Sequence, residues 1–129
     1  MSCERLVGAL VGHLRVQRRL LEFGYAPPET GPAALEAWLV ARDRALVRLR
    51  AYDMTRLAQE TAGALQERPD HPLAAALQAA AERTSELAQA IQRRDRSVAR
   101  TLHSRLERLS RRLNAAHIAR RARERYTGG

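Results

Sequence analysis

Residues 77–113 read LQAAAERTSELAQAIQRRDRSVARTLHSRLERLSRRL, and apolar side chains recur in this stretch mainly at intervals of three and four residues. At about 100° of rotation per residue, such spacing places them on one face of an α-helix. Together with the leucine just before the stretch, this face forms one apolar row: Leu73, Leu77, Leu87, Ile91, Val98, Leu102, Leu106, Leu109 and Leu113. The row is typical of a seam between antiparallel helices. It predicts a long helix that packs lengthwise on others.

Two segments rich in proline interrupt the periodic pattern, GYAPPETGP at 24–32 and RPDHP at 68–72. Proline and glycine end helices, and no stretch alternates with the period of two that a strand requires. The pattern predicts one all-α domain over residues 1–129, with helices at about 3–23, 33–68 and 72–126. We expect the second and third helices to form an antiparallel hairpin, with the shorter first helix packed on it as a three-helix bundle.

A tight turn near residue 70 sets the register of this hairpin, because facing positions then have numbers that add to about 140. Asp53 would face Leu87 in the interior, and Arg42 would come close enough to Asp95 to form an ion pair. Two interpretations of the pair stay open. It fixes the register of the hairpin, as buried polar pairs do in some proteins, or both side chains reach solvent at the helix edge.

The same register leaves the end of the third helix without a partner. Leu35, at the start of the second helix, should lie opposite residue 105, so residues 106–126 extend beyond the hairpin. Three leucines nevertheless continue the apolar row into this overhang: Leu106, Leu109 and Leu113. An exposed apolar row of this kind marks an interaction surface. Its partner would be a second protomer, the first helix and its loop, a tail folded back at a break near Asn114, or another protein.

All 23 basic side chains are arginines, and the formal net charge is +9. The absence of lysine excludes Schiff-base and P-loop lysine chemistry. Residues 93–125 hold 12 of the arginines against three acids, which places the whole positive excess near the end of the chain. Such asymmetry indicates an acidic partner or a phosphate backbone, whereas a merely solvated helix face is the plainer alternative.

Nothing in the sequence provides the residues of a catalytic or metal site. There is one cysteine, Cys3, and the four histidines include no pair spaced by four residues. We therefore expect no enzyme activity, no metal and no cofactor. No apolar run approaches the ~20 residues of a membrane span. The start of the chain is interpreted as the first helix rather than a signal peptide, which together with a free thiol indicates the cytoplasm.

Nucleic-acid binding is the main alternative to protein binding. The arginines near the end of the chain could neutralise several phosphates. However, they are spread around the predicted helix and interleaved with leucines, and no helix-turn-helix spacing is present. The pattern therefore favours an interaction with protein.

Three stretches resemble a known family. They are LEAWLVARDRALVRL at 35–49, IQRRDRSVARTLHSRLERLSRRL at 91–113 and the closing ARRARERY at 119–126. Their order, and the arginine-rich ending with a tyrosine followed by glycine, resemble the flagellar type III export chaperones of the FliT and FlgN kind. The resemblance implies a small cytoplasmic helical chaperone. It would bind the helical terminus of a filament-cap or hook–filament junction protein, prevent premature assembly and deliver the client to the export gate.

The resemblance also implies roles for particular residues. The apolar client-binding surface of the family corresponds here to Leu102, Leu106, Leu109 and Leu113, and the tyrosine that contacts the export gate corresponds to Tyr126. From the charge pattern we further expect Arg105, Arg108 and Arg112, which lie beside the leucines, to steer a client helix that has acidic flanks. The alternatives are an Arg-rich nucleic-acid-binding protein and a self-associating adaptor that forms a homodimer.

Overall fold

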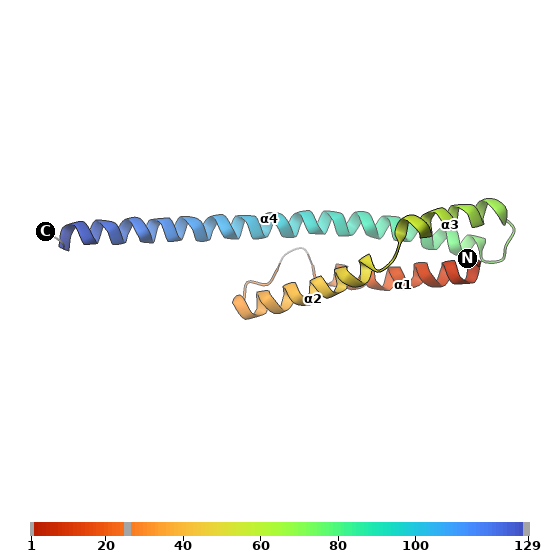
Figure 1. The fold of residues 1–129 in the computed structure, drawn as a ribbon, viewed down its shortest axis with the longest axis horizontal. Helices are drawn as coiled ribbons and strands as arrows, with labels where there is room; N and C mark the ends of the chain where they lie inside the picture. The colour runs from red at the N-terminus through yellow and green to blue at the C-terminus, as the bar shows by residue number, and fades with distance from the viewer. Residues whose placement is uncertain (1, 25–26, 128–129) are drawn as a thin grey trace.

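The computed structural model describes residues 2–24 and 27–127, which form four helices and no strand (Figure 1). The helices are α1 (Cys3–Glu22), α2 (Pro32–Arg50), α3 (Met54–Glu67) and α4 (Ala74–Thr127). The all-α prediction is confirmed. Two residues of the predicted proline-rich loop, 25 and 26, lie outside the described residues.

Helix α1 begins at a capping serine and buries one face along its whole length. The Ser2 hydroxyl accepts a hydrogen bond from the backbone N–H of Arg5 at 3.2 Å, which satisfies one of the free donors of the first turn. The buried face holds Leu6, Leu10 and Leu20, each at most 5% exposed. Burying a leucine contributes about 2 kcal/mol, so this face supplies much of the driving force for packing.

The predicted single helix over 33–68 is wrong, because it divides into α2 and α3. The interruption lies at Ala51, Tyr52 and Asp53. Asp53 does not face Leu87 in the interior. It is exposed, and its Oδ1 accepts a hydrogen bond from the backbone N–H of Arg56 at 3.0 Å, which makes it the N-cap of α3. A short carboxylate competes for backbone N–H groups in this way, and so it favours the start of a helix over its middle.

Tyr52 docks the bend between α2 and α3 onto α1. Its ring meets the ring of His13 edge to face, with centroids 5.2 Å apart and planes at 87°. The tyrosine hydroxyl also lies over Gly12, where an added Cβ atom would come within 2.7 Å of it. The absence of a side chain at Gly12 therefore lets Tyr52 approach the backbone of α1 closely.

Helix α4 begins after the second proline segment and continues without a break for 54 residues. Before it, His71 Nδ1 accepts a hydrogen bond from the backbone N–H of Leu73 at 3.1 Å. At about 1.5 Å per residue, α4 is about 80 Å long. The break near Asn114 that the sequence left open is not present, and the helix passes this residue uninterrupted.

The helices are arranged differently from the predicted hairpin with a short helix packed on it. Helices α1 and α4 begin at the same end of the molecule and run side by side, whereas α2 and α3 run in the opposite direction (Figure 1). The main neighbour of α4 is α1, with α3 beside it, and α2 packs on α1. Helix α1 is thus the element that contacts the other three.

The core consists of two clusters along α1. One joins Leu6 and Leu10 to Leu57 of α3 and Leu77 of α4. The other joins Leu20 to Ala45 of α2 and Ile91 of α4. The bend between α2 and α3 falls between these two clusters, so each half of the bundle has its own packing group.

The predicted contact between Arg42 and Asp95 is confirmed. Arg42 Nη2 forms an ion pair with Asp95 Oδ1, which connects α2 to α4. The guanidinium also lies 5.9 Å from the ring centroid of Trp38, whose Nε1–H donates to the carbonyl of Phe23 at 3.3 Å. Burial lowers the pKa of Arg42 from its ordinary value. The pair therefore lies at a partly buried junction of α1, α2 and α4.

The two glycines of α1 allow a test of the Tyr52 contact. Gly8→Ala should stabilise the fold by up to about 1 kcal/mol, because alanine favours helix and nothing lies within 4 Å of the added Cβ. Gly12→Ala gains the same propensity but displaces Tyr52, which costs about 1–3 kcal/mol. Urea unfolding of both variants would measure the difference. Equal stabilisation by the two alanines would contradict the close approach.

Protonation of His13 should destabilise the fold at low pH. Burial lowers the pKa of His13, an effect that the Gln17 amide one turn away partly opposes. In the unfolded chain the His13 imidazole has an ordinary pKa of about 6.5. Below this pH the unfolded chain therefore binds a proton more readily than the folded chain does. Stability is therefore fully present above this pH and falls as the pH drops towards the folded pKa, by at most about 1.4 kcal/mol per pH unit. Urea midpoints between pH 5 and 8 should show this slope in the His117→Gln control and lack it in His13→Gln.

The register role of the Arg42–Asp95 pair can be tested by a double-mutant cycle. Because the Asp95 side chain is 45% exposed, solvent screening limits the coupling, and we expect about 0.5–1 kcal/mol from Arg42→Leu, Asp95→Asn and the double variant. The measurement is the free energy of unfolding together with the oligomeric state. If Arg42→Leu melts well above the unmodified protein with an unchanged oligomeric state, the pair does not fix the register.

Candidate protein-interaction site

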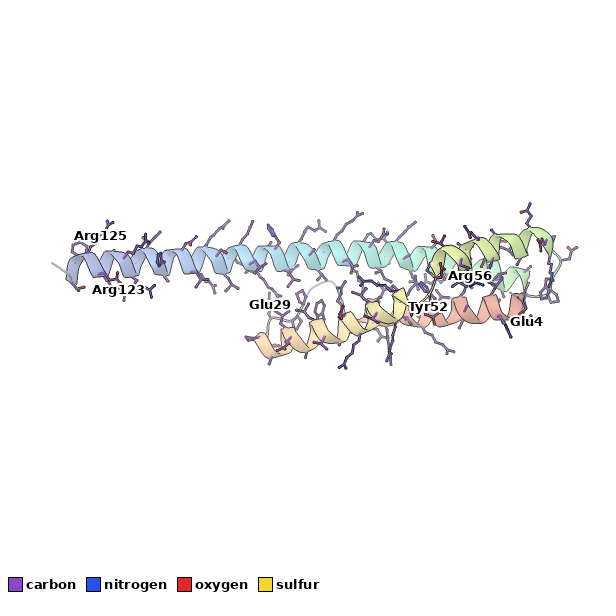
Figure 2. All side chains as sticks on the ribbon, viewed as in Figure 1. Glu4, Glu29, Tyr52, Arg56, Arg123 and Arg125 are labelled. Carbon is purple, nitrogen blue, oxygen red and sulfur yellow. The ribbon has the colours of Figure 1, made fainter. Side chains whose placement is uncertain are left out.

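Helix α4 leaves the bundle at its midpoint and continues alone. Val98 is the last buried residue of the helix, and every residue from 106 to 127 is exposed. Figure 2 shows side chains projecting from all sides of this segment, as far as Arg123 and Arg125 near its end. The 22 residues from 106 to 127, which we call the tail, extend for about 33 Å.

The tail carries the apolar row that the sequence predicted. Leu106, Leu109 and Leu113 are 63%, 54% and 71% exposed. At about 100° per residue they lie within about 40° of the direction of Leu102, and thus in line with the buried Ile91 and Val98. We call these three leucines the tail stripe. Leu102 is half-buried at the edge of the bundle, so it contributes less open surface.

Arg105 does not present a free charge beside the stripe. Its guanidinium donates to the carbonyls of Pro27 at 2.8 Å and Pro28 at 3.1 Å, and it pairs with Glu29 Oε1 at 3.4 Å. The side chain is only 18% exposed. The predicted steering residue therefore ties the proline-rich segment to α4 at the point where the tail begins.

Arg108 and Arg112 are exposed on the same side of the tail stripe as Arg105. With the proline-rich segment and the start of α2, they border a groove of about 660 Å³. Nine residues line it: Pro28, Glu29, Gly31, Pro32, Leu35, Arg105, Arg108, Leu109 and Arg112. The groove brings Leu35 close to α4 at Arg105, as the register predicted. The other side of the stripe carries mainly His103, Ser110, Asn114 and His117.

Two other exposed side chains of the tail lie away from the stripe. Tyr126 is 90% exposed, and the helical rotation places it about 120° from the leucines. Ile118 is 67% exposed and lies almost opposite them. The structure thus brings the leucines together on one face, with Arg112 nearer to them than Arg108 on the basic side. Arg108 and Tyr126 project in one common direction, about 120° from the leucines, and Tyr126 lies five turns further along the helix.

Sequence reasoning missed a second groove, of about 890 Å³, between α1, α3 and α4. Small residues such as Ala58, Ala62 and Ala88 line it, together with Leu49 and Arg50 at the end of α2. The signal that could have indicated the bend is Asp53, a residue type favoured at the N-cap, in the middle of the predicted helix.

Three residues that line this second groove have buried polar atoms. His13 Nδ1, Gln17 Oε1 and Thr61 Oγ1 are buried without a hydrogen-bond partner in the described residues. The Gln17 amide is held in place by its Nε2–H, which donates to the carbonyl of Thr84 at 3.0 Å. Such unpaired groups cost free energy, so they make this part of the bundle less stable than its leucine content alone would indicate.

Within residues 2–24 and 27–127 there is no group of three or more histidine, cysteine or acidic side chains that could hold a metal ion. None of the helices in that part of the chain combines the length and the apolar content needed to cross a bilayer. His103 pairs with Glu107 at 3.1 Å across one turn of α4, where both side chains are largely exposed.

Comparison with protein-family models, with curated proteins and with solved structures gave no match to this chain. The tail is an exposed helix with three leucines on one face.

Proposed function

We propose that the chain is a helical chaperone of the flagellar type III export kind, without enzyme activity, that works in the cytoplasm. Its tail binds the helical terminus of a late export substrate, either the filament-cap or a hook–filament junction protein. This keeps the client from assembling early and delivers it to the export gate, where Tyr126 makes the contact that the family resemblance implies.

The observation that carries the proposal is the tail stripe on a helix that has left the bundle. Three leucines, each more than half exposed, lie on one face within about two turns. A monomer gains nothing from such a surface, whereas a partner helix packed along it would bury all three side chains. Each buried leucine contributes about 2 kcal/mol before the cost of association.

The tail is also prepared for binding. An isolated helix of 22 residues is marginally stable in water, but the tail continues a helix whose first half is fixed by packing, so nucleation costs nothing further. A client that is unfolded before export can therefore fold against a surface that is already ordered. Preorganisation of one partner reduces the entropy lost on binding.

The alternatives make different use of the same tail. Self-association in an antiparallel pair would bring the Arg108 and Arg112 flanks of the two copies onto the same side, where their like charges oppose the pairing. Nucleic-acid binding would use the arginines and leave the leucines exposed. An amphipathic partner helix with acidic flanks would contact both the leucines and the arginines of the tail.

The test is binding of purified filament-cap and hook–filament junction proteins from the same genome, measured by calorimetry with light scattering for stoichiometry. We expect Leu106→Asp/Leu109→Asp to weaken binding at least about 100-fold, because two apolar anchors are replaced by charges. Melting should stay unchanged, since both side chains lie outside the core.

A matched control is available on the opposite side of the tail. Ala115→Asp/Ile118→Asp makes the same change of charge at the same spacing, at two exposed positions away from the stripe, and it should bind normally. Three results would contradict the proposal. They are no binding to either client, a dimer that Leu106→Asp/Leu109→Asp converts to a monomer, or retention of nucleic acid alone, which elutes at about 0.5 M salt.

A further inference from the structure

We infer that the groove beside the start of the tail, between α4 and the proline-rich segment, is a specificity subsite for two carboxylates one turn apart on a partner helix. This inference rests on the proposed function and adds to it a requirement on the partner. The occupant is an acidic amphipathic protein helix, whose apolar face covers the tail stripe while its carboxylates meet Arg108 and Arg112.

The two arginines are the free charges of the groove. Both are exposed, and no hydrogen bond or ion pair engages them in the described part of the chain. They lie four residues apart, or about 6 Å along the helix, which matches two carboxylates spaced by one turn on a helix lying alongside. Arginine presents a planar fork of donors that suits this kind of pairing.

Apolar contact is present at the same place. Leu109, which lies between the two arginines in the sequence, is 54% exposed. Leu35 of α2 lines the same groove. A partner helix can therefore place an apolar side chain in the groove and its carboxylates on the rim. A surface that recognised only phosphate would not need this apolar floor.

The part of the groove at Arg105 and Glu29 limits where the partner's acids can lie. Arg105 has both terminal nitrogens bonded to the proline-rich segment and is largely covered, so it offers little to a partner. Glu29, which lies between the start of α2 and α4 in Figure 2, pairs with Arg105, and the two charges offset each other. Acidic partner residues are therefore attracted to Arg108 and Arg112, further along the helix, and not to this part of the groove.

The basic flank lies on one side of the stripe. Beside the leucines, the other side carries His103, Ser110, Asn114 and His117, and its first arginine, Arg121, lies about two turns beyond Leu113. A partner helix with acids on a single flank therefore matches the site in one direction only, because reversing the helix moves its acids to the far side. The groove thus selects the direction of the partner as well as its charge.

The test uses three synthetic 18-residue helical peptides with the same leucine face. One carries two glutamates one turn apart on one flank, and the others carry glutamine or lysine at those two positions. Binding to the full chain is measured by fluorescence anisotropy at about 0.15 M salt. We expect the glutamate peptide to bind about fivefold more tightly than the glutamine peptide, and the lysine peptide to bind most weakly.

Charge reversal at the groove should invert this order. Arg108→Glu/Arg112→Glu should prefer the lysine peptide, whereas Arg96→Glu/Arg100→Glu should keep the original order. The control pair makes the same change of charge at the same spacing on another side of α4, at two exposed positions. Thermal melting of both variants verifies that the fold is retained.

Three results would overturn the inference. Either the order is unchanged in Arg108→Glu/Arg112→Glu, or the control pair inverts it as strongly, which would mean that only the net charge matters. A DNA duplex that binds more tightly than the glutamate peptide and depends on the same pair would also overturn it.

The proposed function can fail separately. If the cap and junction proteins do not bind but the peptide order holds, the chaperone role is wrong and the subsite stands. If those proteins bind equally to the unmodified chain and to Arg108→Glu/Arg112→Glu, the subsite is wrong and the chaperone role stands.

Discussion

The buried face of α1 is the constraint on which the rest of the structure depends. Leu6 and Leu10 belong to one core cluster and Leu20 to the other, and each cluster includes residues of α4. Helix α2 reaches the core through α1, whereas α3 packs on both α1 and α4. A helix of 20 residues thus contacts all three other elements and connects α2 to the rest of the bundle.

The apolar row of α4 keeps one spacing throughout, but its first part is buried and its last part is exposed. Up to Val98 it is core, because α1 and its neighbours cover it, and from Leu106 onward it is surface. Nothing in the row itself changes at this point. The change comes from the lengths of the other helices and from the Arg105 contact with Pro27 and Pro28, which marks the edge of the bundle. The proposed site begins where the covering elements end.

Periodicity was enough to predict an all-α chain, the overhang of the last helix and the contact between Arg42 and Asp95. It was not enough to show that α1 is the central element, because an apolar face does not identify its partner. An aspartate within an apolar pattern can be a buried residue inside one helix or the N-cap of a new helix. The two differ only in backbone geometry, so the pattern placed Asp53 in the interior. Arg105 was misassigned because its partners are backbone carbonyls, which leave no trace in a side-chain pattern.

The Arg105 contact has a mechanical consequence. The tail is a single straight helix of about 33 Å. The contact of Arg105 with Pro27 and Pro28 lies where this helix leaves the bundle. A sideways load on the end of the tail is therefore carried at two places, by the hydrogen bonds of Arg105 to the proline-rich segment and by the packing of Ile91 and Val98 in the bundle.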